Sequence, residues 1–234
     1  MSKQNKAKKK KNSQPVKSKA QIKAEEQERL AKIKKRAIIV AVALVLIVAT
    51  VITLCVTLSK KHKGFYYVEM TVEDYGTIIL KLDTKAAPKT VRNFVKLVKS
   101  GFYDGLTFHR VIEDFMIQGG DPEANGTGSS KRKVIGEFSS NGYSNPIKHE
   151  RGVISMARSD DPNSASCQFF IVHETSSHLD GNYAAFGYVI KGMDVVDAIV
   201  ENTAKYGNSN GLISNKSFQA VRSEMKLISH KDAE

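Results

Sequence analysis

Between residues 65 and 230, short segments that alternate apolar and polar residues are separated by turns rich in glycine. The segment "YYVEMTVEDYGTIILKL" holds two such runs on either side of Glu73–Gly76, which is the pattern of a β-hairpin. Because the side chains of a strand point alternately to its two faces, this pattern indicates strands with a buried face. Further strands are predicted at 107–112, 115–118, 153–157, 168–172, 185–190 and near 218–228.

Two segments follow the helical period instead. In "PKTVRNFVKLVKSG" the apolar residues recur every three or four positions, Pro88 suits the first helical turn and Gly101 suits the C-terminal end. A second short helix is predicted at 193–201. Two helices among many short strands favour a mainly β domain, a closed antiparallel barrel capped by helices.

The longest apolar run, "AIIVAVALVLIVATVITLCVTL" at 37–58, has 22 residues, no charge and three threonines. A helix rises about 1.5 Å per residue, so this run crosses a hydrocarbon core of about 30 Å. It has no polar face, which argues against a buried core helix. It is longer than the apolar part of a signal peptide and lacks a small-residue cleavage site. The sequence therefore predicts one transmembrane helix.

The net charge of +12 is concentrated ahead of this run. Residues 1–36 carry 14 Lys+Arg against 3 Asp+Glu, whereas residues 64–234 carry 19 against 21. The basic tail has no aromatic residue for base stacking and no groove-reading fold around it, so we expect no specific nucleic-acid binding. Basic residues beside a membrane are attracted to anionic lipid by about 1 kcal/mol each, and we expect this role for the tail.

Flanking charge predicts the orientation. Residues 19–36 hold seven Lys/Arg and residues 59–78 hold three, so the tail is expected to stay cytoplasmic with the domain beyond the membrane. The expected organisation is a disordered basic tail at 1–36 that ends in a short charged helix at 22–35, a transmembrane helix at 37–58, a linker at 59–64, a globular domain at 65–230 and a C-terminal tail at 231–234.

Several chemistries are missing from the sequence. The six histidines are scattered and neither HExxH nor CxxC occurs, so no metal site is expected. No G-x-S-x-G elbow is present, and "NGTGSSK" at 125–131 lacks the spacing of a phosphate-binding loop, so no cofactor is expected. Cys55 lies in the apolar run and Cys167 in the domain, which excludes a disulfide framework.

The absence of disulfides favours a Gram-positive bacterial cell membrane as the location. The alternative is a membrane of the secretory pathway. In that case Asn125 and Asn215, both in N-x-S/T sequons, are candidate glycosylation sites.

Arg110 does not fit its surroundings in "TFHRVIEDFMIQGGDP" (107–122), where most of its neighbours are apolar. Burying an unpaired charge is costly. Arg110 is therefore either a surface residue whose stem lies along apolar groups or a donor held beside an apolar pocket.

The segment "FHRVIEDFMIQGGDP" resembles the signature of the cyclophilin family of peptidyl-prolyl cis-trans isomerases. Four other segments follow in the order of that family: "APKTVRNFVKLVKSGFYDGLTFHR" (87–110), "GVISMAR" (152–158), "CQFFIVHETSSHLDG" (167–181) and "FGYVIKGMDVVDAI" (186–199). The resemblance covers residues 65–230. It implies an eight-stranded antiparallel β-barrel closed at its ends by two helices.

The reaction of that family gives Arg110 a purpose. Rotation about a peptide C–N bond faces a barrier of about 18–20 kcal/mol because the bond is partly double. No bond breaks, so what accelerates rotation is tighter binding of the twisted amide than of either planar form. A guanidinium fixed in a water-poor site stabilises that state, and arginine stays charged with a planar donor fork.

The resemblance also implies roles for individual residues. Arg110 matches the catalytic arginine and Gln118 the glutamine that orients it. The matching substrate-binding residues are the pocket walls Phe115, Met116, Phe170 and Leu179, the rim residues His109, Ala157 and Gln168, and three more positions at Arg158, His178 and Tyr183.

Those last three depart from the common pattern. Arg158 stands where asparagine is usual, at a position where the main chain contacts the substrate. His178 replaces a tryptophan found in many members that bind cyclosporin, which implies weak cyclosporin binding. Tyr183 replaces a histidine and still offers an apolar wall and a hydroxyl.

Two functions compete. The first is an active isomerase tethered to a membrane that assists folding of exported, proline-containing polypeptides, because proline isomerisation is slow enough to limit folding. The second is a module that binds proline-containing segments without turnover. The presence of both Arg110 and Gln118 favours the first.

Overall fold

The structure is a computed structural model that describes residues 19–60 and 64–234, without the side chains at 20–22, 52, 54–60 and 223. The chain forms two compact units, residues 1–61 and residues 62–234. Half of the predicted basic tail and half of the predicted linker, residues 1–18 and 61–63, lie outside the described residues.

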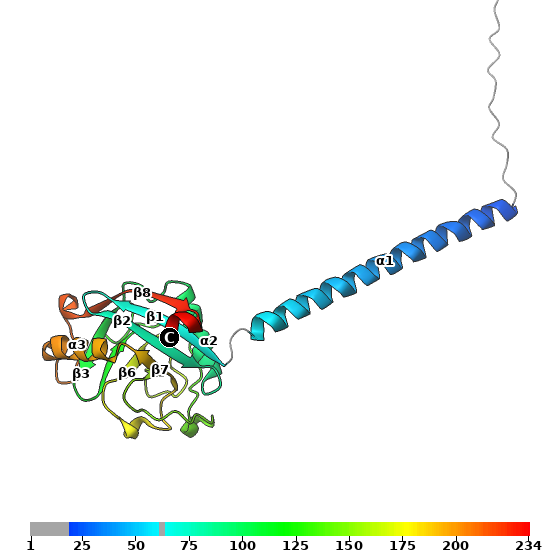
Figure 1. Cartoon of the computed structure of the whole chain (residues 1–234). Coiled ribbons are helices and arrows are strands. Elements are labelled where there is room, and N and C mark those ends of the chain that lie inside the picture. Colours follow the sequence, from blue (N-terminus) through cyan, green and yellow to red (C-terminus); the bar gives the residue numbers. More distant parts are fainter. Residues whose placement is uncertain (1–18, 61–63) are drawn as a thin grey trace, which may run out of the picture. The chain divides into compact units, whose positions relative to one another are not determined.

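The second unit is a closed eight-stranded barrel with the strand order β1-β2-β7-β5-β6-β4-β3-β8, and every paired neighbour is antiparallel. This confirms the predicted closed antiparallel β-barrel (Figure 1). The strands are β1 Phe65–Val72, β2 Gly76–Asp83, β3 Thr107–Ile112, β4 Met116–Gly119, β5 Val153–Met156, β6 Phe169–Val172, β7 Ala185–Lys191 and β8 Ala220–Ile228.

Helix α2 (Pro88–Lys99) forms as the sequence predicts. Pro88 occupies its first turn, and Gly101, just after the C-cap, has a φ of 66°, which glycine adopts without strain. The ring of Phe94 contacts Phe169 and Phe186 inside the barrel, with centroids 5.4 and 5.1 Å apart. Full burial of such a side chain contributes about 1.5–3 kcal/mol, so α2 is held mainly by its apolar face.

Helix α3 (Met193–Thr203) corresponds to the second predicted helix and ends two residues later than predicted. Figure 1 shows it on the side of the barrel away from α2. Short 3₁₀ turns complete the connections: η1 Ser139–Asn141, η2 Ser177–Leu179, η3 Ala204–Tyr206 and η4 Lys216–Phe218.

The last residues, predicted as a tail, form the short helix α4 (His230–Ala233). Ser229 and Asp232 cap each other's backbone N–H groups, and Ala233 is buried. The capping box is the signal that marks this helix in the sequence. All strand partners and the main core lie within residues 64–234, so this unit folds on its own contacts.

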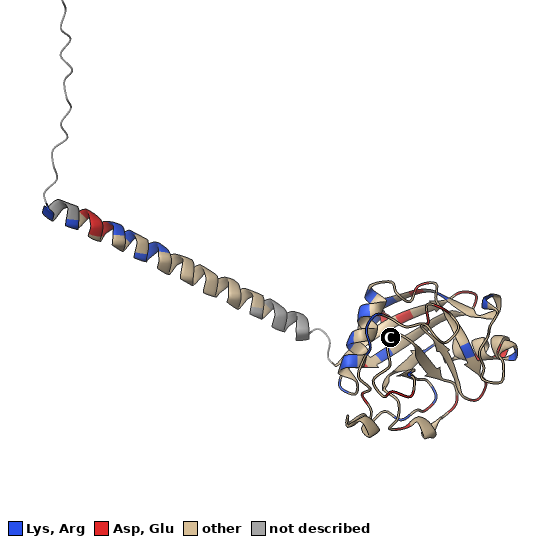
Figure 2. Ribbon diagram, turned by 180° about the vertical axis from the view of Figure 1, so that it is seen from behind, with Lys and Arg blue, Asp and Glu red and all other residues tan. Residues whose placement is uncertain are grey.

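The first unit contains one described element, the 42-residue helix α1 (Lys19–Lys60). The predicted charged helix and the apolar run are therefore parts of one continuous helix. Its sequence carries no charge between Arg36 and Lys60, and Figure 2 shows the charged residues at its N-terminal part. Within the described residues, no helix combines the length and the hydropathy that crossing a membrane requires.

Candidate active site

The site is built on the faces of β3, β4 and β6 that point away from the main core. Ile117 and Phe169 belong to the main core, whereas their chain neighbours Met116 and Phe170 belong to a second apolar cluster. This follows from the two-residue period of a strand. Pairing of β4 with β6 then sets Met116 and Gln118 opposite Val172 and Phe170. The second cluster is thus fixed by the same strands that fill the barrel.

A cavity of about 110 Å³ opens in this second cluster. It is well below the usual 300–1,000 Å³ of a site for a drug-sized ligand, so it suits one small apolar side chain. Its wall carries nine residues: Arg110, Phe115, Met116, Gln118, Ala157, Arg158, Phe170, Leu179 and Tyr183. All nine are among the predicted site residues.

Arg110 is held at the edge of this cavity by two hydrogen bonds. Its Nε donates to the Asn210 carbonyl at 2.7 Å, and its Nη1 donates to Gln118 Oε1 at 3.1 Å. A guanidinium has five N–H groups, so three remain for a bound group. Partial burial lowers the pKa of Arg110 from its usual value, while the nearby Tyr183 opposes this shift. Arginine remains charged in neutral solution.

Gln118 is itself fixed by a second amide. Its Nε2 donates to Gln168 Oε1 at 2.8 Å, and Gln168 Nε2 donates to the carbonyls of Gly126 and Gly128 at 3.1 and 2.8 Å. Because each amide has a defined donor and acceptor end, this chain fixes which end of Gln118 faces Arg110. Gln168 therefore supports the site from behind, and it lines an adjoining cavity of about 300 Å³ instead of the small one.

Arg158 brings a second guanidinium to the cavity. Its Cζ lies 4.7 Å from the ring centroid of Tyr183 and 5.4 Å from that of Phe138. Its N–H groups donate to the carbonyls of Asn182, Ser159 and Asp160. These contacts hold the side chain of Arg158 against the surrounding loops and aromatic rings.

His109 differs from its predicted position at the rim. Its ring is fully buried and does not line the cavity. The pairing of β3 with β4 passes from Phe108↔Gly119 to Arg110↔Gln118, which leaves one extra residue in β3. Such a bulge breaks the alternation of faces, so Phe108 and His109 are both buried while Arg110 reaches the cavity.

His178 also lies outside the cavity wall. It is exposed on η2 and packs its ring against Phe115, with the centroids 5.5 Å apart. Its neighbour Leu179 is buried and lines the cavity. His178 therefore supports the Phe115 side of the pocket from the solvent side.

Two supports of the site are not predictable from the sequence. One is Asn210, whose main-chain carbonyl accepts from Arg110 across 100 residues of chain; main-chain acceptors leave no trace in residue identity. The other is His149, which stacks against Phe170 at 6.0 Å and is fully buried. The isolated "KHE" around His149 carries no periodic or motif signal.

His149 is bonded like the histidine of a hydrolytic triad. Its Nδ1 lies 3.0 Å from Asp180 Oδ1 and its Nε2 lies 3.0 Å from Ser155 Oγ. Burial lowers the pKa of His149, so the neutral ring donates from Nδ1 to the carboxylate and accepts from the serine. Ser155 is fully buried and out of reach of any substrate. The set of Asp180, His149 and Ser155 therefore supports the ring of Phe170, and Ser155 does not serve as a nucleophile.

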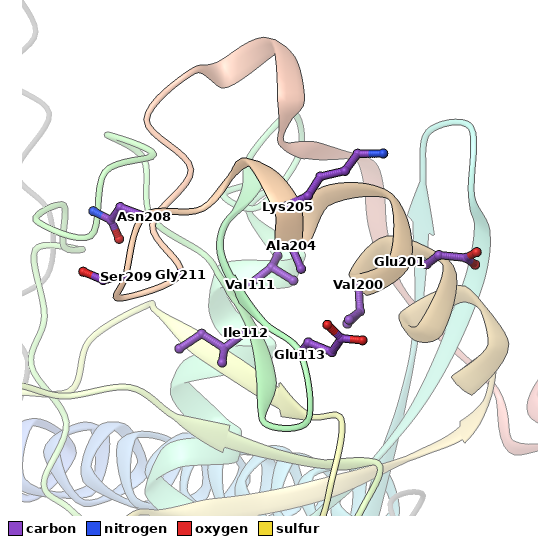
Figure 3. Close-up of a pocket in the computed structure, with 10 residues that line it drawn as sticks. All are labelled: Val111, Ile112, Glu113, Val200, Glu201, Ala204, Lys205, Asn208, Ser209 and Gly211. Carbon is purple, nitrogen blue, oxygen red and sulfur yellow. The ribbon is translucent and has the colours of Figure 1, made fainter.

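A larger cavity, of about 380 Å³, lies elsewhere (Figure 3). It lies between the end of β3 and the region of α3 and η3, with Glu113 and Glu201 on its wall. It has no fixed donor beside an apolar recess. Among the residues that the structure describes, no three His, Cys, Asp or Glu side chains are grouped to hold a metal ion.

Residues 67–219 match the family model "Cyclophilin type peptidyl-prolyl cis-trans isomerase/CLD". Peptidyl-prolyl cis-trans isomerase B of Bacillus subtilis is 46% identical over 123 residues, 53% of this chain and 82% of that protein. A Streptomyces antibioticus isomerase is 44% identical over 144 residues, 58% of this chain and 83% of that one. In Aspergillus oryzae peptidyl-prolyl cis-trans isomerase-like 2, the match is 44% over 131 residues and spans only 22% of the fungal protein.

A solved structure gives the same result for the fold. The crystal structure of a Cryptosporidium parvum cyclophilin type peptidyl-prolyl cis-trans isomerase superposes with a TM-score of 0.61 at 28% identity, covering 71% of this chain and 99% of that one. The same parasite protein was also solved in the presence of the dipeptide Ala-Pro. With more than half its length matched by the family model, the chain belongs to the cyclophilin-type peptidyl-prolyl cis-trans isomerases.

Proposed function

We propose that residues 64–234 catalyse rotation about Xaa-Pro peptide bonds by stabilising the twisted amide without a covalent step. The observation that carries this is the position of Arg110, fixed by Gln118 and Asn210 at the edge of a small apolar cavity. The proline ring would enter the recess formed by Phe115, Met116, Phe170 and Leu179.

Twisting an amide localises the lone pair on the proline nitrogen and increases its attraction for a hydrogen-bond donor. The three uncommitted N–H groups of Arg110 are available to that lone pair or to the amide oxygen. Because the guanidinium is already oriented, no reorganisation is needed as the charge develops. The recess holds the ring so that rotation takes place at the peptide bond.

Arg110→Ala tests this assignment in a protease-coupled assay with a proline-containing tetrapeptide and residues 64–234. Loss of an oriented charged donor is expected to lower kcat/KM by about 10²–10³-fold. Arg151→Ala is the matched control, since Arg151 is a surface residue paired with Asp197. Wild-type turnover by the Arg110→Ala variant would refute the assignment of Arg110 as the catalytic residue. Binding of the peptide by the wild-type domain with no turnover would establish the binding module instead.

We further propose that α1 anchors this domain to a membrane. The support is the uncharged run at 37–58, part of whose side chains lie outside the described residues, and the charge excess on its N-terminal flank. The domain would then face the extracytoplasmic side and act on exported chains, with a Gram-positive cell membrane favoured. Protease treatment of intact cells should remove the domain; its full protection in cells that expose other surface proteins would refute this topology.

The basic tail is proposed to contact anionic lipid on the opposite face of that membrane. Peptide 1–36 is expected to bind vesicles with anionic lipid and to lose this binding as salt increases. Equal binding to neutral vesicles would contradict an electrostatic role.

A further inference from the structure

A second recess, of about 340 Å³, lies where the β1–β2 turn meets the end of α3 and the segment before β8. None of its residues lines the cavity beside Arg110. We call it the turn recess, and it is lined by Glu73, Asp74, Tyr75, Asn202, Thr203, Tyr206, Ser217, Phe218, Gln219, Ala220 and Val221.

Two aromatic rings form an exposed stack in the turn recess. The rings of Tyr206 and Phe218 are nearly parallel, 10° apart, with centroids 4.1 Å from each other. Each residue is 42% exposed, although aromatic side chains usually bury most of their surface. In the described part of the barrel unit, only Tyr188 and Ile190 are comparably exposed large apolar residues. The stack is thus an apolar platform open to solvent.

The charged side chains that line the recess are of one sign. Glu73 and Asp74 are exposed carboxylates on the wall, and no lysine, arginine or histidine lines the recess. Within the described residues neither carboxylate forms an ion pair. Asn202 uses its amide N–H to bond Ala198, so its oxygen is left as one more acceptor. The recess therefore offers acceptors and negative charge, and no cationic side chain lines its wall.

The platform already attracts a cation of this chain. Lys205 Nζ lies 5.3 Å from the centroid of the Tyr206 ring, within the range of a cation–π contact. Burial, with Asp74 and Tyr206 nearby, raises the pKa of Tyr75, so the third ring of the recess stays neutral and supplies a phenol. Rings with carboxylates beside them favour a flat cation, because a guanidinium stacks on a ring while its edge donates to a carboxylate.

We propose that the turn recess binds an arginine side chain of a partner polypeptide. The guanidinium stacks on the exposed face of Phe218 and donates to Glu73 and Asp74. This surface is separate from isomerisation, so it would bring basic polypeptides to the domain whether or not they present proline to Arg110.

The test is a titration of ¹⁵N-labelled residues 64–234 with N-acetyl-arginine amide, followed by amide chemical shifts. N-acetyl-citrulline amide, which has the same shape without the charge, is the control ligand. We expect saturable shifts centred on residues 73–75 and 217–219 with an affinity on the order of millimolar, and at least about 10-fold weaker binding of the citrulline compound.

Two variants separate the contributions of charge and ring. Glu73→Gln with Asp74→Asn, both at exposed positions, should weaken arginine binding about 10-fold, and Phe218→Leu should weaken it while keeping an apolar side chain. Glu113→Gln, at an acidic residue of the other large cavity, should leave binding unchanged. Equal binding of citrulline, shifts that map elsewhere, or unchanged binding by the carboxylate variant would each overturn the proposal.

Discussion

Two arginines of the barrel unit, Arg110 and Arg222, differ in the groups that contact their guanidinium groups. Arg110 is half-buried and bonded to a carbonyl and an amide oxygen. Arg222 is fully buried, and no described residue accepts a hydrogen bond from its guanidinium nitrogens. Three rings surround it instead, with Cζ 4.9 Å from Phe108, 5.3 Å from Phe169 and 5.9 Å from Tyr103. Burial lowers its pKa to about 10, so it keeps its charge at neutral pH.

Replacing Arg222 by methionine should therefore stabilise the domain. Cation–π contacts contribute about 2 kcal/mol when desolvated, but the cost of burying an ion is several kcal/mol. We expect Arg222→Met to increase the free energy of unfolding by about 1–4 kcal/mol in urea denaturation. Phe108→Leu is the comparison, because it removes one ring and leaves the charge, and it should destabilise. A loss of stability in Arg222→Met would mean that the buried guanidinium has a stronger partner than the rings.

At the level of elements, the strands and helices α2 and α3 were predicted well because they follow from hydrophobic periods of two and 3.6 residues. The cavity wall was predicted well because its residues belong to recognisable motifs. The prediction failed where one extra residue altered the period. Nothing in "TFHRVI" shows that Phe108 and His109 share a buried side, since the bulge arises only from pairing with β4. It also missed Asn210, whose contribution to Arg110 comes from its main chain.

The loop before β8 supplies that main-chain oxygen, and Asn208 holds the loop. Asn208 Oδ1 accepts from the N–H groups of Asn210 and Leu212 at 2.9 and 3.1 Å. Asn208→Ala should free the Asn210 carbonyl and loosen Arg110, lowering kcat/KM for proline peptides by about 10-fold, because small misplacements of a catalytic group are costly. KM should change less than kcat.

Asn215→Ala is the matched control for that loop. Asn215 makes the same kind of turn, accepting from Ser217 N–H at 3.0 Å, but it does not contact Arg110. It should lose a similar amount of stability with no loss of turnover. Equal effects of the two variants on kcat would show that Asn208 acts only on stability.

At the scale of the whole molecule, two buried histidines link folding to pH. Burial lowers the pKa of His109 to about 4 and also lowers that of His149. As the pH is lowered, these histidines take up protons near pH 6.5 in the unfolded chain but only at lower pH in the folded one. The free energy of unfolding is therefore highest above pH 6.5 and falls as the pH drops towards 4. Each histidine contributes a slope of up to about 1.4 kcal/mol per pH unit.

His109→Leu should reduce this slope by about half, because the ring has no hydrogen-bond partner among the described residues and its loss removes one of the two titrating groups. Unfolding free energies measured by urea titration between pH 7 and 4.5 would show it. Asn215→Ala, which removes a side chain that does not titrate, is the control and should keep the wild-type slope. The carboxylates of Asp121 and Asp180, whose pKa values are lowered by hydrogen bonds despite burial, act only below about pH 4.

The extra residue in β3 has a consequence for insertions and deletions. Removing the residue at position 109 would restore strict alternation, with Phe108 facing the inside of the barrel and Arg110, then its direct neighbour, still facing the cavity. A lineage that keeps this enzyme is thus free to exchange or even to lose residue 109 without moving Arg110 to the other face of the strand.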